Sequence, residues 1–281
     1  MSLVPLRLGL KRGLYAFYTT LTTREGMAQV LIFNAIPLAV LLLNRDRPLP
    51  GSNVSVSVSM LPGLLAVIVV FVVQIIAYYL SSEREDGTLL RVKAMPNGMF
   101  AYVVGLATVS SLDTLVSVML VFGPAVLFVV AGVPITAAGF WLGLAGFLLL
   151  GLLACLPLGL FIGSVVRNPR TIGGVGFLGT MGLAMLSGLF FPAQVLWGWV
   201  QVLVQVMPLY WLGHGMRSVF LPAEAAALEI GGSWRIPEAI GVLGLWAAVG
   251  LVLGPVLLRR MARRESGSAV ESRRQHVLQR T

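Results

Sequence analysis

Charged residues are scarce in this chain. Only 11% of its 281 residues are Asp, Glu, Lys or Arg, whereas 57% are hydrophobic. Soluble domains carry roughly 25% charged residues, so the composition excludes an ordinary soluble protein and indicates an integral membrane protein. The single cysteine, Cys155, excludes an internal disulfide. Its position in an apolar run predicts a small buried side chain.

Several kinds of catalytic and targeting sequence are also missing. His214 and His276 lie far apart and have no Cys or acidic neighbours at metal-ligand spacing, so we expect no metal site. The chain has no Gly-x-x-x-x-Gly-Lys-Ser/Thr phosphate loop, so we expect neither ATP hydrolysis nor a bound cofactor. Residues 1–24 are basic but contain no apolar core before a cleavage site, so we expect no signal peptide.

The long apolar runs predict an all-α protein that crosses the membrane six times. Each run is close to the roughly 20 residues that one crossing requires. The expected spans are 27–43, 61–81, one within 100–130, one within 137–166 that Pro157 interrupts, 172–191, and 238–258. We expect residues 25–260 to form this transmembrane domain.

The segments around these spans have different characters. In residues 1–24, Leu6, Leu10 and Leu14 recur at helical spacing between basic residues, which predicts an amphipathic helix in the membrane interface. Residues 50–59 form a polar loop that is either a short strand or irregular. Residues 192–222 hold an apolar run too short for a span, so we expect short re-entrant helices there. Residues 261–281 are expected to be a disordered tail.

The basic residues orient this topology. With six spans, sixteen of the 20 Lys and Arg residues lie on the side of both termini and four lie on the other. Cytosolic loops of membrane proteins are enriched in Lys and Arg, so both termini are expected in the cytosol, at the plasma membrane of a bacterium. The positive charge therefore does not indicate a nucleic-acid partner.

One cytosolic loop, residues 83–96, is unusually rich in charge. It begins with Glu83-Arg84-Glu85-Asp86 and continues as Gly87-Thr88-Leu89-Leu90-Arg91-Val92-Lys93. Glycine commonly ends a helix, and a threonine can cap the next one. We expect a short helix whose leucines and Val92 face the cytosol and contact a partner. The alternative is an ordinary loop whose leucines enter the lipid interface.

This loop resembles the coupling helix of type-2 ABC exporter permeases. A second block agrees with the resemblance: Leu186-Ser187-Gly188-Leu189-Phe190-Phe191-Pro192, Met207-Pro208-Leu209-Tyr210 and Met216-Arg217. The resemblance implies the type V exporter fold, two permease subunits and two separate ATPase subunits that bind ATP and Mg. It also implies that the ATPase contacts are Glu83, Arg84, Glu85, Gly87, Thr88, Leu89, Leu90 and Arg91. The composition is closest to the daunorubicin-resistance type.

Two polar side chains inside expected spans are candidates for the transport path. Asp113 carries a charge that is costly in a membrane, and Ser110, Ser111 and Thr114 could hydrogen-bond to it. Gln74 is expected to form a helix–helix hydrogen bond or to line the path. The preferred function is export of drug-like amphiphiles. The alternatives are export of lipids or lipid-linked glycans, and proton-coupled transport through Asp113.

Overall fold

The computed structural model describes residues 3–48, 55–128, 133, 135–166 and 168–264. The regular elements of this part of the chain are helices, as the composition predicted. In chain order they are α1 (Val4–Thr22), α2 (Arg24–Leu43), α3 (Val56–Glu85), α4 (Thr88–Lys93), α5 (Gly98–Phe128), α6 (Ala138–Val165), α7 (Pro169–Thr171), η1 (Ile172–Gly176), α8 (Phe177–Leu186), η2 (Ala193–Val195), α9 (Gly198–Val206), α10 (Pro208–Phe220), η3 (Ala223–Leu228) and α11 (Ile236–Arg264).

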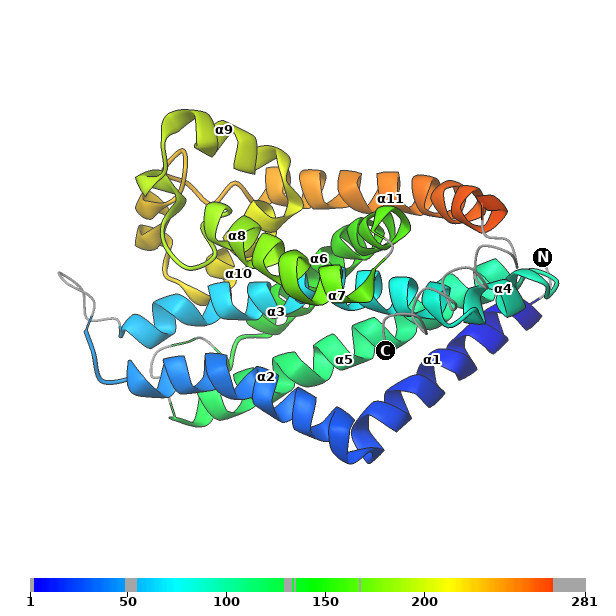
Figure 1. The fold of residues 1–281 in the computed structure, drawn as a ribbon. Helices are drawn as coiled ribbons and strands as arrows, with labels where there is room; N and C mark the ends of the chain where they lie inside the picture. Colours follow the sequence, from blue (N-terminus) through cyan, green and yellow to red (C-terminus); the bar gives the residue numbers. More distant parts are fainter. Residues whose placement is uncertain (1–2, 49–54, 129–132, 134, 167, 265–281) are drawn as a thin grey trace.

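The helices form an elongated bundle with two different ends (Figure 1). The short helix α4 lies at one end, together with the start of α1 and the end of α11. The helix α9 and the segments that join α10 to α11 lie toward the other end. We call these the α4 end and the α9 end. The start of α1 and the end of α11 therefore lie at the same end of the bundle.

Five of the helices are long and apolar enough to cross a membrane. They are α2, α3, α5, α6 and the Ile236–Gly254 part of α11. Helix α3 begins at Val56, earlier than the span expected from residue 61, because the Ser55 side chain caps it by accepting a hydrogen bond from the Val58 amide. The last four residues of the polar loop at 50–59 are therefore helical. Residues 49–54 lie outside the described residues.

The expected fifth span, 172–191, is the one that is not a single long helix. Helix α7 has three residues, η1 is a π-helical turn of five, and α8 has ten and ends at Leu186. Gly188 follows with a φ of 68°, which breaks the helix. The count of six spans therefore stays a prediction. The last expected span continues to Arg264, so residues 261–264 are helical, and residues 265–281 lie outside the described residues.

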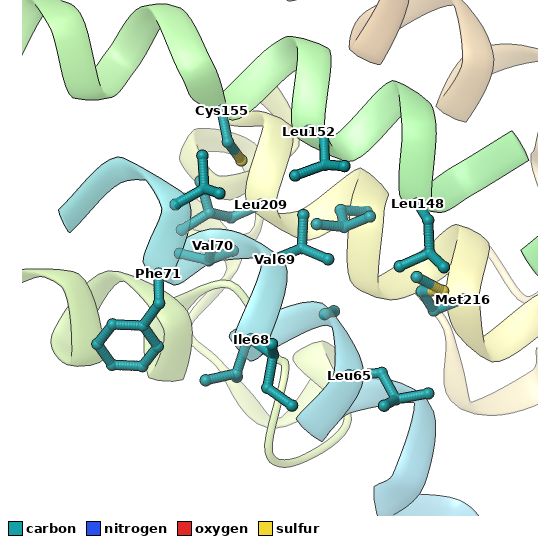
Figure 2. Packing of buried hydrophobic residues seen from close by; sticks show 14 of the residues in the cluster. Leu65, Ile68, Val69, Val70, Phe71, Leu148, Leu152, Cys155, Leu209 and Met216 are labelled. Carbon is teal, nitrogen blue, oxygen red and sulfur yellow. The ribbon is translucent and has the colours of Figure 1, made fainter. Parts of the chain in front are cut away.

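Helix α3 is the centre of the bundle. Every residue from Leu61 to Val73 is buried, as expected for a helix that is apolar on all sides. Figure 2 shows this packing, in which side chains of α3 face those of α6 and α10. Cys155 of α6 is fully buried there, as its apolar neighbourhood predicted.

Glycines allow α6 to approach its neighbours closely. A Cβ atom added at Gly159 would lie 2.8 Å from the Val73 carbonyl oxygen of α3, and one at Gly163 would lie 2.9 Å from the Ala77 Cα. The small-residue pattern at these two positions is therefore a packing surface, as in many membrane helices. Gly250 of α11 lies against the ring of Pro157. Helix α6 continues through Pro157 without a break.

Helix α1 is a separate amphipathic helix, but glycines form its protein-facing side. Gly9 and Gly13 are buried against α5, with Gly9 next to Ala101 and Val104. The leucines at 6, 10 and 14 are exposed on the surface of the chain. An exposed leucine stripe suits a lipid-facing side, so the interfacial position remains the prediction for α1.

Candidate functional site

The turn between α3 and α5 begins with a glycine and a side-chain cap. Helix α3 ends at Glu85, and Gly87 adopts a left-handed conformation with a φ of 78° that most side chains disfavour. The glycine thus separates α3 from α4, as predicted. The expected cap at Thr88 was wrong. The Asp86 side chain caps α4 instead, because its Oδ1 accepts a 2.8 Å hydrogen bond from the Thr88 amide.

The apolar residues of α4 attach it to the bundle. Leu89 and Val92 are 2% and 5% exposed and belong to the hydrophobic core. The expectation that they face the cytosol was wrong, because a six-residue helix needs apolar contacts to stay folded. Leu90 is half-buried, and Arg91 and Lys93 are exposed. The outward surface of this turn is therefore mainly charged.

Glu83 and Arg84, which also belong to the predicted ATPase contact, form hydrogen bonds with neighbouring helices. Glu83 accepts hydrogen bonds of 2.8 and 2.7 Å from Arg12 of α1, and the Arg12 guanidinium lies 4.6 Å from the centre of the Tyr102 ring. Arg84 is 5% exposed and donates to the carbonyl oxygens of Gly163 and Ser164, at 3.2 and 3.1 Å. Arg84 thereby satisfies carbonyls at the end of α6 that have no helical partner.

The eight predicted contact residues therefore divide into two groups. Glu85 and Arg91 are exposed, and Gly87, Thr88 and Leu90 are half-buried, so a partner could reach them. The remaining three, Glu83, Arg84 and Leu89, connect the turn to α1, α6 and the core.

Gln74 forms the predicted helix–helix hydrogen bond. Its Nε2 donates to the carbonyl oxygen of Ile172 in η1, and its Oε1 accepts from the Thr180 hydroxyl of α8 at 3.3 Å. The side chain thus joins the central helix to the expected fifth span. Both of its polar ends are used within the protein.

Asp113 lies midway along α5, the helix against which both α1 and α2 pack. On one side of it along α5, Gly13 of α1 packs against Gly105 and Thr108. On the other side, Asn34 of α2 donates a 3.1 Å hydrogen bond to Ser117. Asp113 is therefore level with the junction between α1 and α2, where the 20-residue helix α2 begins.

The expected hydrogen bonds to Asp113 do not form. Thr114 donates to the Ser110 carbonyl at 2.8 Å instead. The Asp113 Oδ1 and the Ser110 Oγ are enclosed and have no hydrogen-bond partner among the described residues. Asp113 is also within electrostatic range of the Tyr79 hydroxyl of α3. Asp113 and Gln74 therefore lie in different surroundings and do not share one polar site.

A buried ionic cluster lies toward the α9 end. Glu229, which follows η3, accepts a 3.1 Å hydrogen bond from Arg217 Nη2, and its other oxygen accepts from Arg217 Nε. His214 Nδ1 lies 2.9 Å from Glu229 Oε2. Arg217 also donates to the Gly188 carbonyl at 2.9 Å. The cluster therefore ties α10 both to the end of α8 and to the loop before α11.

The contacts of His214 indicate which of its ring nitrogens carries the proton. The Arg235 backbone amide can only donate, and it lies 3.2 Å from Nε2. The carboxylate of Glu229 can only accept, so the proton of a neutral His214 is on Nδ1. Burial alone would raise the pKa of Glu229, but hydrogen bonds from His214 and Arg217 outweigh it and lower that pKa to about 2. Glu229 is thus a stable buried anion.

Sequence reasoning missed this cluster. His214 and Arg217 are one helical turn apart, but Glu229 lies 15 residues beyond His214 in an irregular segment. The number of residues between a helix and a loop that packs back against it is not fixed, so sequence spacing could not pair Glu229 with His214 and Arg217. The one available signal was the charge of Arg217 in an otherwise apolar helix, which needs a buried anion when it is enclosed.

An apolar groove of about 420 Å³ opens between α6, α10 and α11. Its lining includes Gly143, Phe147 and Ile240. Neither Asp113 nor Gln74 lines it, so neither of the predicted path residues faces this groove.

The fold defines the class of protein first. Five apolar helices long enough to span a bilayer, one of them buried at the centre of the bundle, are typical of an all-α integral membrane protein. A family model described as ABC-2 type transporter matches residues 7–221. The chain belongs to this family and is a permease component of an ABC transporter. The match ends at the last helix before η3 and includes the α3–α5 turn. Among curated proteins, none matches the chain.

Membership of the family has general consequences. ABC-2 permeases work with an ATPase subunit and as dimers. The chain is therefore the membrane-embedded part of a larger transporter.

Proposed function

We propose that this chain is the permease subunit of an ATP-driven exporter of hydrophobic or amphiphilic compounds. Two copies, or one copy and a related chain, would form the membrane part in a bacterial plasma membrane. Two separate ATPase subunits would bind ATP and Mg beneath them. The single observation that carries this proposal is the match to the ABC-2 family across residues 7–221.

The proposed docking surface is the outward side of the α3–α5 turn. Glu85 and Arg91 are exposed, and Leu90 is half-buried beside them. Behind this surface, Leu89 and Val92 fix α4 to the core, and Arg84 fixes the end of α3 to the end of α6. A partner that pushes on α4 therefore moves the ends of α3 and α6 together. This rigid attachment is what a coupling element requires.

The proposed substrates are drug-like amphiphiles. The described surface of the chain offers the substrate few fixed charges, and exposed side chains along η1 and α8 are apolar, including Val175, Leu178 and Leu183. A path of this kind discriminates weakly between similar apolar molecules. Lipids and lipid-linked glycans would be recognised as alternative substrates in the same assay.

The docking surface is tested by Leu90→Asp and Arg91→Glu, separately, with Arg45→Glu as the matched control. Arg45 is an exposed arginine on the loop after α2, away from the α4 end. We expect each α4 variant to weaken binding of the ATPase subunit by about tenfold, because a misplaced charge at an interface costs on the order of 1–2 kcal/mol. Binding is measured by titrating the purified ATPase subunit against the permease in nanodiscs.

The control is expected to bind like the unmodified chain. Unchanged binding by both α4 variants would contradict the docking surface. Equal loss in Arg45→Glu would show that net charge, rather than the position of α4, determines binding.

A further inference from the structure

The start of the expected fifth span has an unusual backbone. Residues Ile172–Gly176 form a π-helical turn with the sequence Ile-Gly-Gly-Val-Gly. At its end the Phe177 amide donates to the Gly174 carbonyl, three residues back, so the hydrogen-bond register changes between α7 and α8. Such turns are rare and mark points where a helix can bend.

The outer side of this turn has room to move. A Cβ atom added at Gly173 or Gly174 would meet nothing within 4 Å. Glycine also has the greatest backbone freedom of any residue. The turn therefore combines a changed register, flexible residues and free space at one place in the span.

The inner side of the turn is held by one side chain from α3. Gln74 donates to the carbonyl of Ile172, the first residue of the turn, and accepts from Thr180, which lies beyond its end. A Cβ atom added at Gly176 would lie 3.2 Å from the Gln74 Oε1, so glycine there makes room for this side chain. Gln74 therefore bridges the turn from end to end.

Helix α8, which follows the turn, also packs against α3. The Phe177 ring lies 5.4 Å from the Phe71 ring of α3, and Thr180 and Ala184 are buried. Ile172, at the base of the turn, is also buried. The freedom of the span is thus confined to the residues between these two anchored points.

We propose that the π-helical turn is a hinge of the fifth span, and that Gln74 is the positioning residue that sets its bend. Its role in transport rests on the proposed function, because α3 ends at the proposed docking turn. Motion of α3 is transmitted to α8 through the contacts of Gln74 and Phe71. Bending at the turn allows α7, which precedes it, to stay in position while α8 moves. Gln74 is not a substrate ligand in this account, since both its polar ends are occupied.

The hinge is tested by two matched pairs of substitutions on one helix. Gly173→Ala with Gly174→Ala restricts the turn, and Gly179→Ala with Gly182→Ala restricts the regular helix above it. All four positions have nothing within 4 Å of an added Cβ, so none of the four creates a clash. Each Gly→Ala change restricts the backbone conformations open to its residue. We expect the first pair to lower substrate transported per ATP by about fivefold and the second to stay within about twofold.

Gln74 is tested by Gln74→Leu and Gln74→Glu. Leucine keeps the side chain's bulk and removes both hydrogen bonds, whereas a carboxylate can still accept from Thr180 but cannot donate to Ile172. We expect ATP hydrolysis to continue in both while transport per ATP falls, with Gln74→Leu the more affected. A role as substrate ligand would instead raise the KM for substrate and leave the ratio of transport to hydrolysis unchanged at saturation.

Distances between pairs of spin labels, measured on the permease without any ATPase subunit, test the hinge independently of transport. One label pair, at Arg170 and Phe100, lies below the turn, and a second, at Leu183 and Leu127, lies above it; all four side chains are exposed. The hinge predicts that Gly173→Ala with Gly174→Ala narrows the distribution of distances between the labels at Arg170 and Phe100, and that Gln74→Leu broadens this distribution. The distribution between the labels at Leu183 and Leu127 is expected to stay unchanged in both variants. Equal widths in all variants would overturn the hinge even if the complex transports. Altered widths in a complex that does not transport would keep the hinge and refute the proposed function.

Discussion

Glu229→Gln should destabilise the protein more than any other single replacement of an acid by its amide. The substitution keeps the shape of the side chain but removes the negative charge that Arg217 and His214 contact. Glu229 is 3% exposed and Arg217 is 8% exposed, so solvent cannot replace the lost interaction. Removing one partner of a buried ion pair costs about 3–5 kcal/mol, because the other charge is left uncompensated.

The pKa of Glu229 gives an independent magnitude. It is lowered from 4.5 to about 2, and one pKa unit corresponds to about 1.4 kcal/mol, so the folded state gains on the order of 3 kcal/mol from the charged form. The two magnitudes agree. Because the folded-state pKa is the lower one, this contribution is present above about pH 4.5 and is lost as the pH falls toward 2.

Thermal unfolding in detergent measures this effect, with Glu224→Gln as the matched control. Glu224 is an exposed acid in η3, five residues before Glu229. We expect Glu229→Gln to lower Tm by roughly 6–15 °C and Glu224→Gln to leave it nearly unchanged. The difference between Glu229→Gln and the unmodified chain should shrink between pH 4.5 and pH 3. A Tm equal to that of the control, or a difference independent of pH, would refute the buried anion.

Two further substitutions test other parts of the structure. Arg84→Met keeps the length of the side chain but removes its hydrogen bonds to α6, so we expect a loss of about 1.5–3 kcal/mol in stability. The loss is measured by unfolding in detergent, with the exposed residue change Arg170→Met as the control. Equal stability of the two variants would contradict the capping role of Arg84. Asp113→Asn should leave ATP-driven transport within about twofold, because the amide keeps the shape of the side chain and the enclosed Asp113 Oδ1 has no hydrogen-bond partner among the described residues to lose. A loss of transport in Asp113→Asn, with the protein still folded, would return Asp113 to the mechanism.

The long apolar helices could be predicted closely because their signal is local. The bounds expected for the first span, 27–43, differ from those of α2 by three residues at one end. Gly87 was identified as a helix break because glycine tolerates the left-handed conformation. These features depend on the composition of one segment. They need no knowledge of what packs against it.

Side-chain partners could not be predicted because they come from distant segments. Leu89 and Leu90 are adjacent and chemically identical, yet one is in the core and the other is half-buried. Arg84 is separated by about 80 residues from the carbonyls that it caps. The resemblance to exporter permeases predicted an outward contact for Arg84, but a long side chain beside a helix end can turn inward.

The fifth span shows a third situation, in which the sequence holds a signal that is easily misread. Three glycines within Ile172–Gly176 look like part of an ordinary glycine-rich membrane helix. In the structure they form a π-helical turn, and the Gln74 side chain from α3 hydrogen-bonds to its first residue. The length of the apolar run predicted a span there but gave no sign of this turn.

ATP-dependent transport by the reconstituted complex tests the central claim most directly. The chain is placed in inside-out vesicles with and without its candidate ATPase subunit, and uptake of a fluorescent amphiphilic drug is followed after ATP is added. The account predicts uptake only when both proteins and ATP are present, and loss of that uptake in Arg91→Glu. Proton-driven uptake by this chain alone would contradict it.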